Sequence, residues 1–78
     1  MPYEIIIKHA ADRVLRRLTP AERLRITGKI DLLGLNPDEP KLDIKRPQGE
    51  NFYRLRVGDW RVIFDRQDVV KVITIEKN

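Results

Sequence analysis

The stretch that most constrains the fold is residues 51–66, in which two runs of alternating side chains flank the dipeptide Gly58-Asp59. Runs rich in aromatic and β-branched residues, separated by two turn residues, predict a β-hairpin. Glycine in the first loop position fits a type II′ turn, because that position requires a positive φ. The stretch therefore predicts two adjacent antiparallel strands joined by a two-residue loop.

A loop at Gly58-Asp59 also determines which residues of the two strands are paired. The expected pairs are Tyr53–Phe64, Arg54–Ile63, Leu55–Val62, Arg56–Arg61 and Val57–Trp60. Directly opposed side chains lie on the same face of a sheet. One face is then apolar and is expected to join the core; it carries Tyr53, Leu55, Val57, Trp60, Val62 and Phe64. The other face carries Phe52, Arg54, Arg56, Arg61 and Ile63.

Three arginines are thus predicted on the face of the hairpin that is not part of the core. Like charges placed directly opposite each other destabilise a strand pair, so Arg56 opposite Arg61 indicates a surface that receives an anion. The alternative interpretation is an ordinary solvated sheet face, on which scattered arginines are common. A register shift of one residue would place the arginines on different faces.

Composition limits the class of protein. Seventy-eight residues, 41% of them hydrophobic, predict one small domain with a core. No cysteine is present, which excludes disulfides and cysteine-based sites, and no motif indicates a metal or a cofactor. No apolar stretch approaches the roughly 18–20 residues that span a bilayer and no signal-peptide pattern opens the chain, so we expect a cytoplasmic protein without a membrane partner.

The positive charge is concentrated near the hairpin. The net charge is +4, and six basic residues lie between Lys41 and Arg61 against three acidic ones. Such a balance permits nucleic-acid binding without requiring it. Lys45 and Arg46 lie just before the hairpin and are candidate RNA-binding residues; the alternative is that they only make the loop soluble.

The first eighteen residues predict one strand and one helix. Residues 3–8 alternate, with Tyr3, Ile5 and Ile7 on one face. The pattern then changes to helical spacing from His9 to Leu18. His9, the only histidine, is interpreted as a residue of the junction rather than as a catalyst.

A second helix is predicted to begin at Thr19. Threonine as the N-cap, Pro20 in the first turn and Glu22 three residues after the cap form a capping box. The helix is expected to extend to about Leu33 and to end at Gly34. Because so few residues separate the two helices, we expect an antiparallel helical hairpin. The candidate core contacts of this helix are Leu24, Ile26, Ile30 and Leu33.

The rest of the chain completes the sheet. Residues 34–50 hold three prolines and predict a loop with a short extended piece at 41–45. Residues 65–68 predict a turn, and residues 69–76 predict a last strand. The sequence does not decide which side chains of this strand face the core. The order βααβββ predicts a two-layer α+β domain, in which the helical hairpin packs on an antiparallel sheet and leaves the arginine face uncovered.

An open arginine face is suited to one kind of chemistry. Three guanidinium groups can bind a phosphodiester and stabilise the negative charge that develops when the 2′-hydroxyl of RNA attacks the neighbouring phosphate. Arginine has a pKa above about 12 and does not act readily as a general acid or base. Proton transfer must therefore come from other groups.

The run Phe-Tyr-Arg-Leu-Arg-Val-Gly-Asp-Trp-Arg-Val-Ile-Phe at residues 52–64 resembles the signature hairpin of the RelE/ParE superfamily of bacterial toxins. The βααβββ order is similar to that superfamily as well, and the short helices make the chain more similar to its RelE branch. In RelE-type toxins, basic residues of the second strand and an arginine early in the third form the RNA-cleaving site. The resemblance thus implies catalytic roles for Arg54, Arg56 and Arg61, without a metal.

Two features depart from the family pattern. Some members have lysine where this chain has Arg54 and Arg56, and a lysine with a lowered pKa can accept a proton. The family pattern also continues past the last strand with a basic stretch that holds an arginine and a tyrosine, whereas this chain ends at Asn78. We therefore expect residues 1–78 to be a single RelE-like domain that lacks this C-terminal segment, in a truncated, weakened or inactive form.

The resemblance implies a leading function and two alternatives. The leading one is a toxin of a type II toxin–antitoxin system, an mRNA interferase that cleaves messenger RNA on the ribosome and inhibits translation. Its implied partners are a cognate antitoxin, the ribosome and mRNA, with no small-molecule cofactor. The alternatives are a ParE-like inhibitor of DNA gyrase that performs no chemistry, and a non-catalytic remnant that binds the antitoxin.

Overall fold

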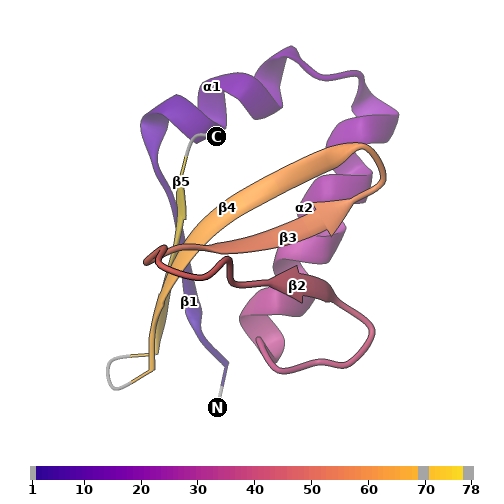
Figure 1. The fold of residues 1–78 in the computed structure, drawn as a ribbon. Coiled ribbons are helices and arrows are strands. Elements are labelled where there is room, and N and C mark those ends of the chain that lie inside the picture. The colour runs from indigo at the N-terminus through magenta and orange to yellow at the C-terminus, as the bar shows by residue number, and fades with distance from the viewer. Residues whose placement is uncertain (1, 69–70, 77–78) are drawn as a thin grey trace.

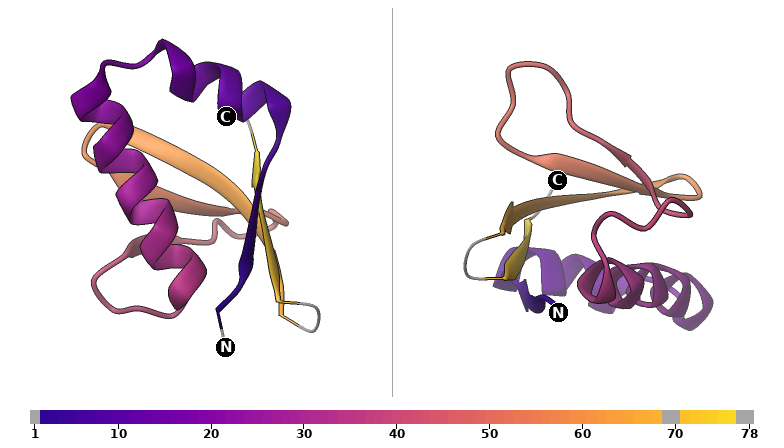
Figure 2. Two further views of the ribbon diagram at one scale, coloured as in Figure 1. Left: turned by 180° about the vertical axis from the view of Figure 1, so that it is seen from behind. Right: turned by 90° about the horizontal axis from the view of Figure 1, so that it is seen from below.

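The computed structural model describes residues 2–68 and 71–76, the side chains of residues 72–76 excepted. In chain order the elements are β1 (Glu4–Ile7), α1 (His9–Arg17), α2 (Pro20–Leu35), β2 (Asp43–Lys45), β3 (Tyr53–Val57), β4 (Trp60–Gln67) and β5 (Val72–Glu76). The strands form one sheet in the order β1-β5-β4-β3-β2. Both helices lie on one side of this sheet, as the two views of Figure 2 show. The predicted two-layer α+β fold is confirmed.

The hairpin of β3 and β4 has the predicted register at every pair, from Tyr53 opposite Phe64 to Val57 opposite Trp60. Gly58 has a φ of 60°, the positive value that its place in the loop requires. Strand β5 continues the antiparallel meander, since Phe64 is paired with Ile75 and Asp65 with Thr74. The facing of the β5 side chains lies outside the described part of the chain.

One further strand lies at each edge of the meander. The short extended piece expected at 41–45 is β2, which pairs antiparallel with β3 through Asp43–Arg56, Ile44–Leu55 and Lys45–Arg54. At the other edge β1 pairs parallel with β5, in the register that places Ile5 beside Ile73. The predicted turn at residues 65–68 is wrong in extent, because β4 continues to Gln67, which is paired with Val72. Only Asp68 of that segment is in a turn.

The core lies between the helices and the covered face of the sheet. Phe64, Leu33 and Leu55 are fully buried there. Tyr3, Ile5 and Ile7 pack partly buried against this core, as their alternation predicted. The buried apolar residues are Ala11, Ile26, Ile30, Leu33, Leu42, Leu55, Val57, Val62 and Phe64.

Leu24, expected in the core, is 73% exposed. At 100° per residue it lies on the side of α2 opposite Ile26, which is buried with Ile30 and Leu33. Of the four predicted contacts, Ile26, Ile30 and Leu33 are therefore the ones that face the sheet, and Gly34 is buried beside them.

Gly34 does not end α2, which continues to Leu35 and is capped by Asn36. A Cβ on Gly34 would lie 2.9 Å from Cγ1 of Ile5, and the Gly34 carbonyl accepts a 2.7 Å hydrogen bond from the Tyr3 amide. The glycine is thus required for the close approach of β1 to α2 rather than for a left-handed cap.

The start of α2 is the predicted one. Thr19 is the N-cap, and its hydroxyl oxygen accepts a hydrogen bond from the amide of Glu22. The connection to α1 is as short as expected. Figure 1 shows that the two helices run at a wide angle to each other, so the prediction that they pack antiparallel is wrong. No helix in the described residues is both long enough and apolar enough to cross a membrane.

Candidate functional site

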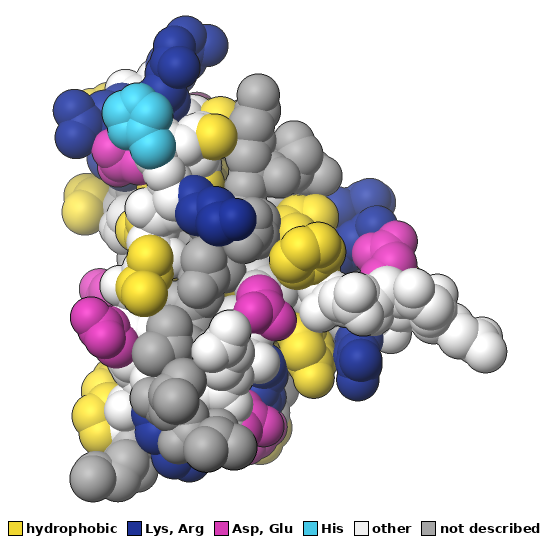
Figure 3. Space-filling model, turned by 90° about the vertical axis from the view of Figure 1, so that its left-hand side faces the viewer, with side chains coloured by type: hydrophobic (Ala, Val, Ile, Leu, Met, Phe, Trp, Pro, Cys, Tyr) yellow, Lys and Arg dark blue, Asp and Glu magenta, His cyan; other side chains and the backbone are white. Residues whose placement is uncertain are grey.

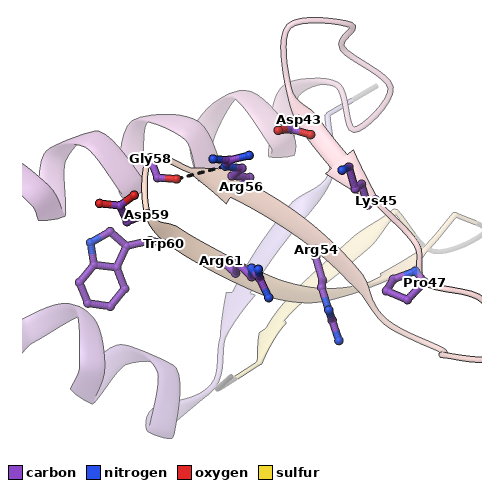
Figure 4. Close-up of a pocket in the computed structure, with 9 residues that line it drawn as sticks. All are labelled: Asp43, Lys45, Pro47, Arg54, Arg56, Gly58, Asp59, Trp60 and Arg61. Atoms are coloured by element: carbon purple, nitrogen blue, oxygen red, sulfur yellow. Dashed lines mark hydrogen bonds between the residues drawn. The ribbon is translucent and has the colours of Figure 1, made fainter.

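A pocket of about 400 Å³ lies on the face of the sheet that the helices leave uncovered. Its floor is formed by β3 and β4, one wall by β2, and one end by the hairpin loop (Figure 4). The residues that line it are Asp43, Lys45, Pro47, Arg54, Arg56, Gly58, Asp59, Trp60 and Arg61.

The structure brings together the three arginines that the register predicted. Arg56 is paired with Arg61 across the hairpin, and Arg54 lies two residues before Arg56 on the same face. Arg56 and Arg61 are exposed, whereas Arg54 is half-buried. Their gathering follows from the two-residue loop, because a period of two places alternate residues of both strands on one face.

The three guanidinium groups differ in their contacts. Nε of Arg56 donates a 3.3 Å hydrogen bond to the carbonyl of Gly58. Nη2 of Arg54 contacts both carboxylate oxygens of Glu50. Arg61 has no hydrogen bond or ion pair with any residue that the structure describes. A ligand therefore meets at least one guanidinium that is not already engaged.

Lys45 and Arg46, the two candidate RNA-binding residues, lie in different surroundings. Lys45 is opposite Arg54 and lines the pocket. Arg46 is not among the lining residues; its guanidinium lies 5.4 Å from the centroid of the Tyr53 ring. Neighbouring residues of an extended chain point to opposite sides, so only Lys45 is added to the arginines.

Sequence reasoning missed several residues of this pocket. Asp43 is opposite Arg56 and brings a carboxylate among the guanidinium groups. Asp59, interpreted from sequence as an ordinary turn residue, also lines the pocket, as does Pro47. The alternation of residues 43–45 would have found Asp43 if the pairing of β2 with β3 had been known.

Trp60, expected in the core, is 38% exposed. Its Nε1 donates a 2.9 Å hydrogen bond to Oε2 of Glu22, at the start of α2. Oε1 of the same carboxylate accepts a 2.9 Å bond from the Thr19 hydroxyl. The bond from Trp60, followed by that from Thr19, holds the pKa of Glu22 below its ordinary value of 4.5. The end of the hairpin, and with it one end of the pocket, is thereby tied to α2.

Positive charge alone does not distinguish the pocket from the rest of the protein surface. Its distinguishing feature is that several basic side chains line one cavity. Lys and Arg side chains also lie near α1, on the side of the molecule shown in Figure 3. His9 begins α1, is exposed and does not line the pocket. Within the described residues no group of three or more His, Cys, Asp or Glu side chains could hold a metal ion.

The arrangement can bind an anion and stabilise developing negative charge. Guanidinium forks match the oxygens of a phosphate, and several of them around one pocket favour a dianionic or polyanionic ligand. Of the lining residues, Asp43 and Asp59 carry carboxylates, a kind of group that can act as a general base.

Comparison with known proteins identifies the family. No protein-family model and no curated protein matches the sequence. Among solved structures, a chain of the archaeal RelE–RelB complex from Pyrococcus horikoshii OT3 matches with a TM-score of 0.82 and 32% sequence identity. The match covers 96% of this chain and 90% of that chain. The chain belongs to the RelE toxin superfamily.

A second solved structure has the same fold at lower identity. It is the toxin–antitoxin complex RelBE2 from Mycobacterium tuberculosis, which matches with a TM-score of 0.78 and 20% identity over 96% of this chain and 86% of that chain. At this identity the likeness shows the fold alone. The family resemblance inferred from the hairpin is confirmed by the first structure.

Proposed function

We propose that this member of the RelE superfamily is the toxin of a toxin–antitoxin system and cleaves messenger RNA on the ribosome. The observation that carries the proposal is the gathering of Arg54, Arg56 and Arg61 around one open pocket. Family membership adds the biological context, since the structure that shows the family is a RelE–RelB complex. A cognate antitoxin is accordingly the proposed protein partner.

In this reaction the 2′-oxygen of a ribose forms a bond to the adjacent phosphorus, and the bond from phosphorus to the 5′-oxygen breaks. The products are a 2′,3′-cyclic phosphate and a 5′-hydroxyl. Arg56 and Arg61 would hold the phosphate oxygens and stabilise the extra charge of the transition state. One proton leaves the 2′-hydroxyl and another is added to the 5′-oxygen, so the reaction also needs groups that transfer protons. Asp43 is the proposed acceptor, because it lies opposite Arg56 in the pocket.

The test is a ribosome-dependent cleavage assay with purified protein. Arg56→Ala and Arg61→Ala should each lower the cleavage rate by about 10²- to 10³-fold, the loss typical of removing one donor to a developing oxyanion. Arg13→Ala is the matched control, because it removes the same charge from an exposed position of α1. Circular dichroism of each variant should be unchanged. Equal cleavage by all four proteins would contradict the proposal.

Two further measurements separate the alternatives. A DNA supercoiling assay with gyrase, run beside the cleavage assay, distinguishes RNA cleavage from gyrase inhibition. Inhibition of gyrase without RNA cleavage would assign the protein to the other branch of the superfamily. Binding of the antitoxin with neither activity would identify a non-catalytic partner.

A further inference from the structure

Arg54 differs from the other two arginines because it already has an acidic partner. Nη2 of Arg54 lies 3.1 Å from Oε1 and 3.2 Å from Oε2 of Glu50. Arg56 contacts only a backbone carbonyl, and Arg61 has no hydrogen-bond partner in the described residues. One of the three guanidinium groups is therefore neutralised from within the protein.

The loop before β3 holds Glu50 close to the pocket. The amide of Glu50 donates a 3.2 Å hydrogen bond to the carbonyl of Pro47, which lines the pocket. Gly49, between them, has a φ of 82°, which a side chain would disfavour. This turn places the carboxylate in the loop just before β3, four residues before Arg54.

In this ion pair, not every N–H donor of Arg54 has a well-placed acceptor. Both oxygens of Glu50 meet one nitrogen, whereas a guanidinium binds an oxyanion best through two parallel N–H bonds. Nε of Arg54 is buried and has no hydrogen-bond partner in the described residues. A buried donor without a partner is unfavourable. Because the side chains of Arg54 and Glu50 are 35% and 43% exposed, their ion pair is of the weak, solvent-screened kind.

From these contacts we infer that Glu50 is an internal counterion of the pocket, which occupies the place of a phosphate at Arg54. A nucleic-acid phosphate that binds Nη2 of Arg54 must displace this carboxylate. Glu50 thus lowers the affinity of the pocket for phosphates. The inference rests on the proposed function only in taking a nucleic-acid phosphate as the ligand.

The exchange has a signature in the salt dependence of binding. Each phosphate of a single strand that a cation of the protein neutralises makes the slope of log K against log salt steeper by about 0.7. When Arg54 exchanges Glu50 for a phosphate, one ion pair replaces another, so the exchange neutralises less net charge than binding by an unpaired arginine would. Removal of the Glu50 charge should therefore steepen the slope as well as tighten binding.

The probe for the test is a fluorescein-labelled single-stranded hexanucleotide with 2′-O-methyl riboses, which the protein cannot cleave because the nucleophile is blocked. Fluorescence anisotropy measures its affinity at several salt concentrations. Glu50→Gln is compared with Asp31→Asn, which removes one acidic charge from an exposed position of α2. Both variants have the same net charge, so bulk electrostatics affect them alike.

We expect Glu50→Gln to bind the hexanucleotide about 2- to 5-fold more tightly than Asp31→Asn, in keeping with the strength of an exposed ion pair. In a protein that also carries Arg54→Ala, the substitution Glu50→Gln should have no further effect. Equal affinities of Glu50→Gln and Asp31→Asn, including the absence of binding by both, would overturn the inference. So would a gain that persists without Arg54. Because the probe cannot be cleaved, the result does not depend on whether the protein is a nuclease.

Discussion

Trp60 and Glu22 connect the hairpin to the start of α2 by a 2.9 Å hydrogen bond between residues 38 positions apart in the chain. The Glu22 carboxylate also accepts a hydrogen bond from the Thr19 hydroxyl, so the same side chain bonds to the N-cap of α2 and to the hairpin. This bond explains why Trp60 stays partly exposed although it is on the core side of its strand. Its indole N–H needs a polar partner, and that partner is at the surface.

The first prediction concerns acid stability. Because the pKa of Glu22 is lowered below 4.5 in the folded protein, its charged form is favoured by folding. Its contribution is present above the ordinary pKa and is lost as the pH falls through the lowered one. Between about pH 5 and about pH 3 the urea midpoint of Glu22→Gln should therefore fall less than that of the wild type. Identical curves for Glu22→Gln and the wild type would contradict the prediction.

The second prediction compares two glycines of α2. Gly34→Ala places a methyl group 2.9 Å from the Ile5 side chain and should destabilise the fold by about 1–3 kcal/mol. Gly28→Ala places it in open space and should stabilise the helix by about 0.5–1 kcal/mol. Urea unfolding measures both. Stabilisation by both substitutions would show that helix propensity, rather than the contact with β1, determines the result.

The third prediction concerns Arg66, whose side chain is only 14% exposed. Its Nη1 lies 3.1 Å from Oδ1 of Asp38, and its Nε lies 2.8 Å from Oδ1 of Asp68. These two ion pairs join the segment after α2 to the end of β4. Burial disfavours its charge, but the bonds to these carboxylates outweigh burial and raise its pKa. Arg66→Lys should lower the free energy of unfolding by about 1 kcal/mol, because an ammonium group cannot reproduce the planar fork.

Arg16→Lys provides the comparison for Arg66. Arg16 forms an ion pair with Asp12 along α1, but its side chain is 77% exposed. Its replacement should change the free energy of unfolding by less than about 0.5 kcal/mol. Equal effects of the two replacements in urea unfolding would show that the burial of Arg66 does not strengthen the contribution of its ion pairs to stability.

The fourth prediction separates two adjacent basic residues. Lys45→Ala should weaken binding of the 2′-O-methyl hexanucleotide and make the salt slope shallower by about 0.7, because Lys45 lines the pocket. Arg46→Ala should leave that slope unchanged, since its guanidinium lies over the Tyr53 ring. Anisotropy titrations at several salt concentrations provide the measurement. A shallower slope for Arg46→Ala would instead extend the binding surface to the far side of β2.

Much of the site could be predicted because its determinants are local. The two-residue loop at Gly58 and the period of two in β3 and β4 place Arg54, Arg56 and Arg61 on one face without reference to the rest of the chain. The N-cap at Thr19 is equally local, since the hydroxyl and the amide it accepts from are three residues apart. Hydrogen bonds over such short separations depend on sequence spacing alone.

The residues that sequence reasoning missed depend on contacts between distant segments. Gly34 was expected to end a helix, but its role comes from Ile5, a residue of β1. Asp43 joins the pocket only because β2 pairs with β3, and Glu50 matters only because a turn brings it to Arg54.

The amino-acid sequence by itself determined the hairpin, its register and the face on which the arginines gather, since turn geometry and strand alternation act over a few residues. Only the tertiary structure decided which other side chains surround those arginines, how β1 pairs in parallel with β5, and where Trp60 finds its acceptor. These features arise when segments far apart in the chain pack on one core, and no local pattern specifies that packing.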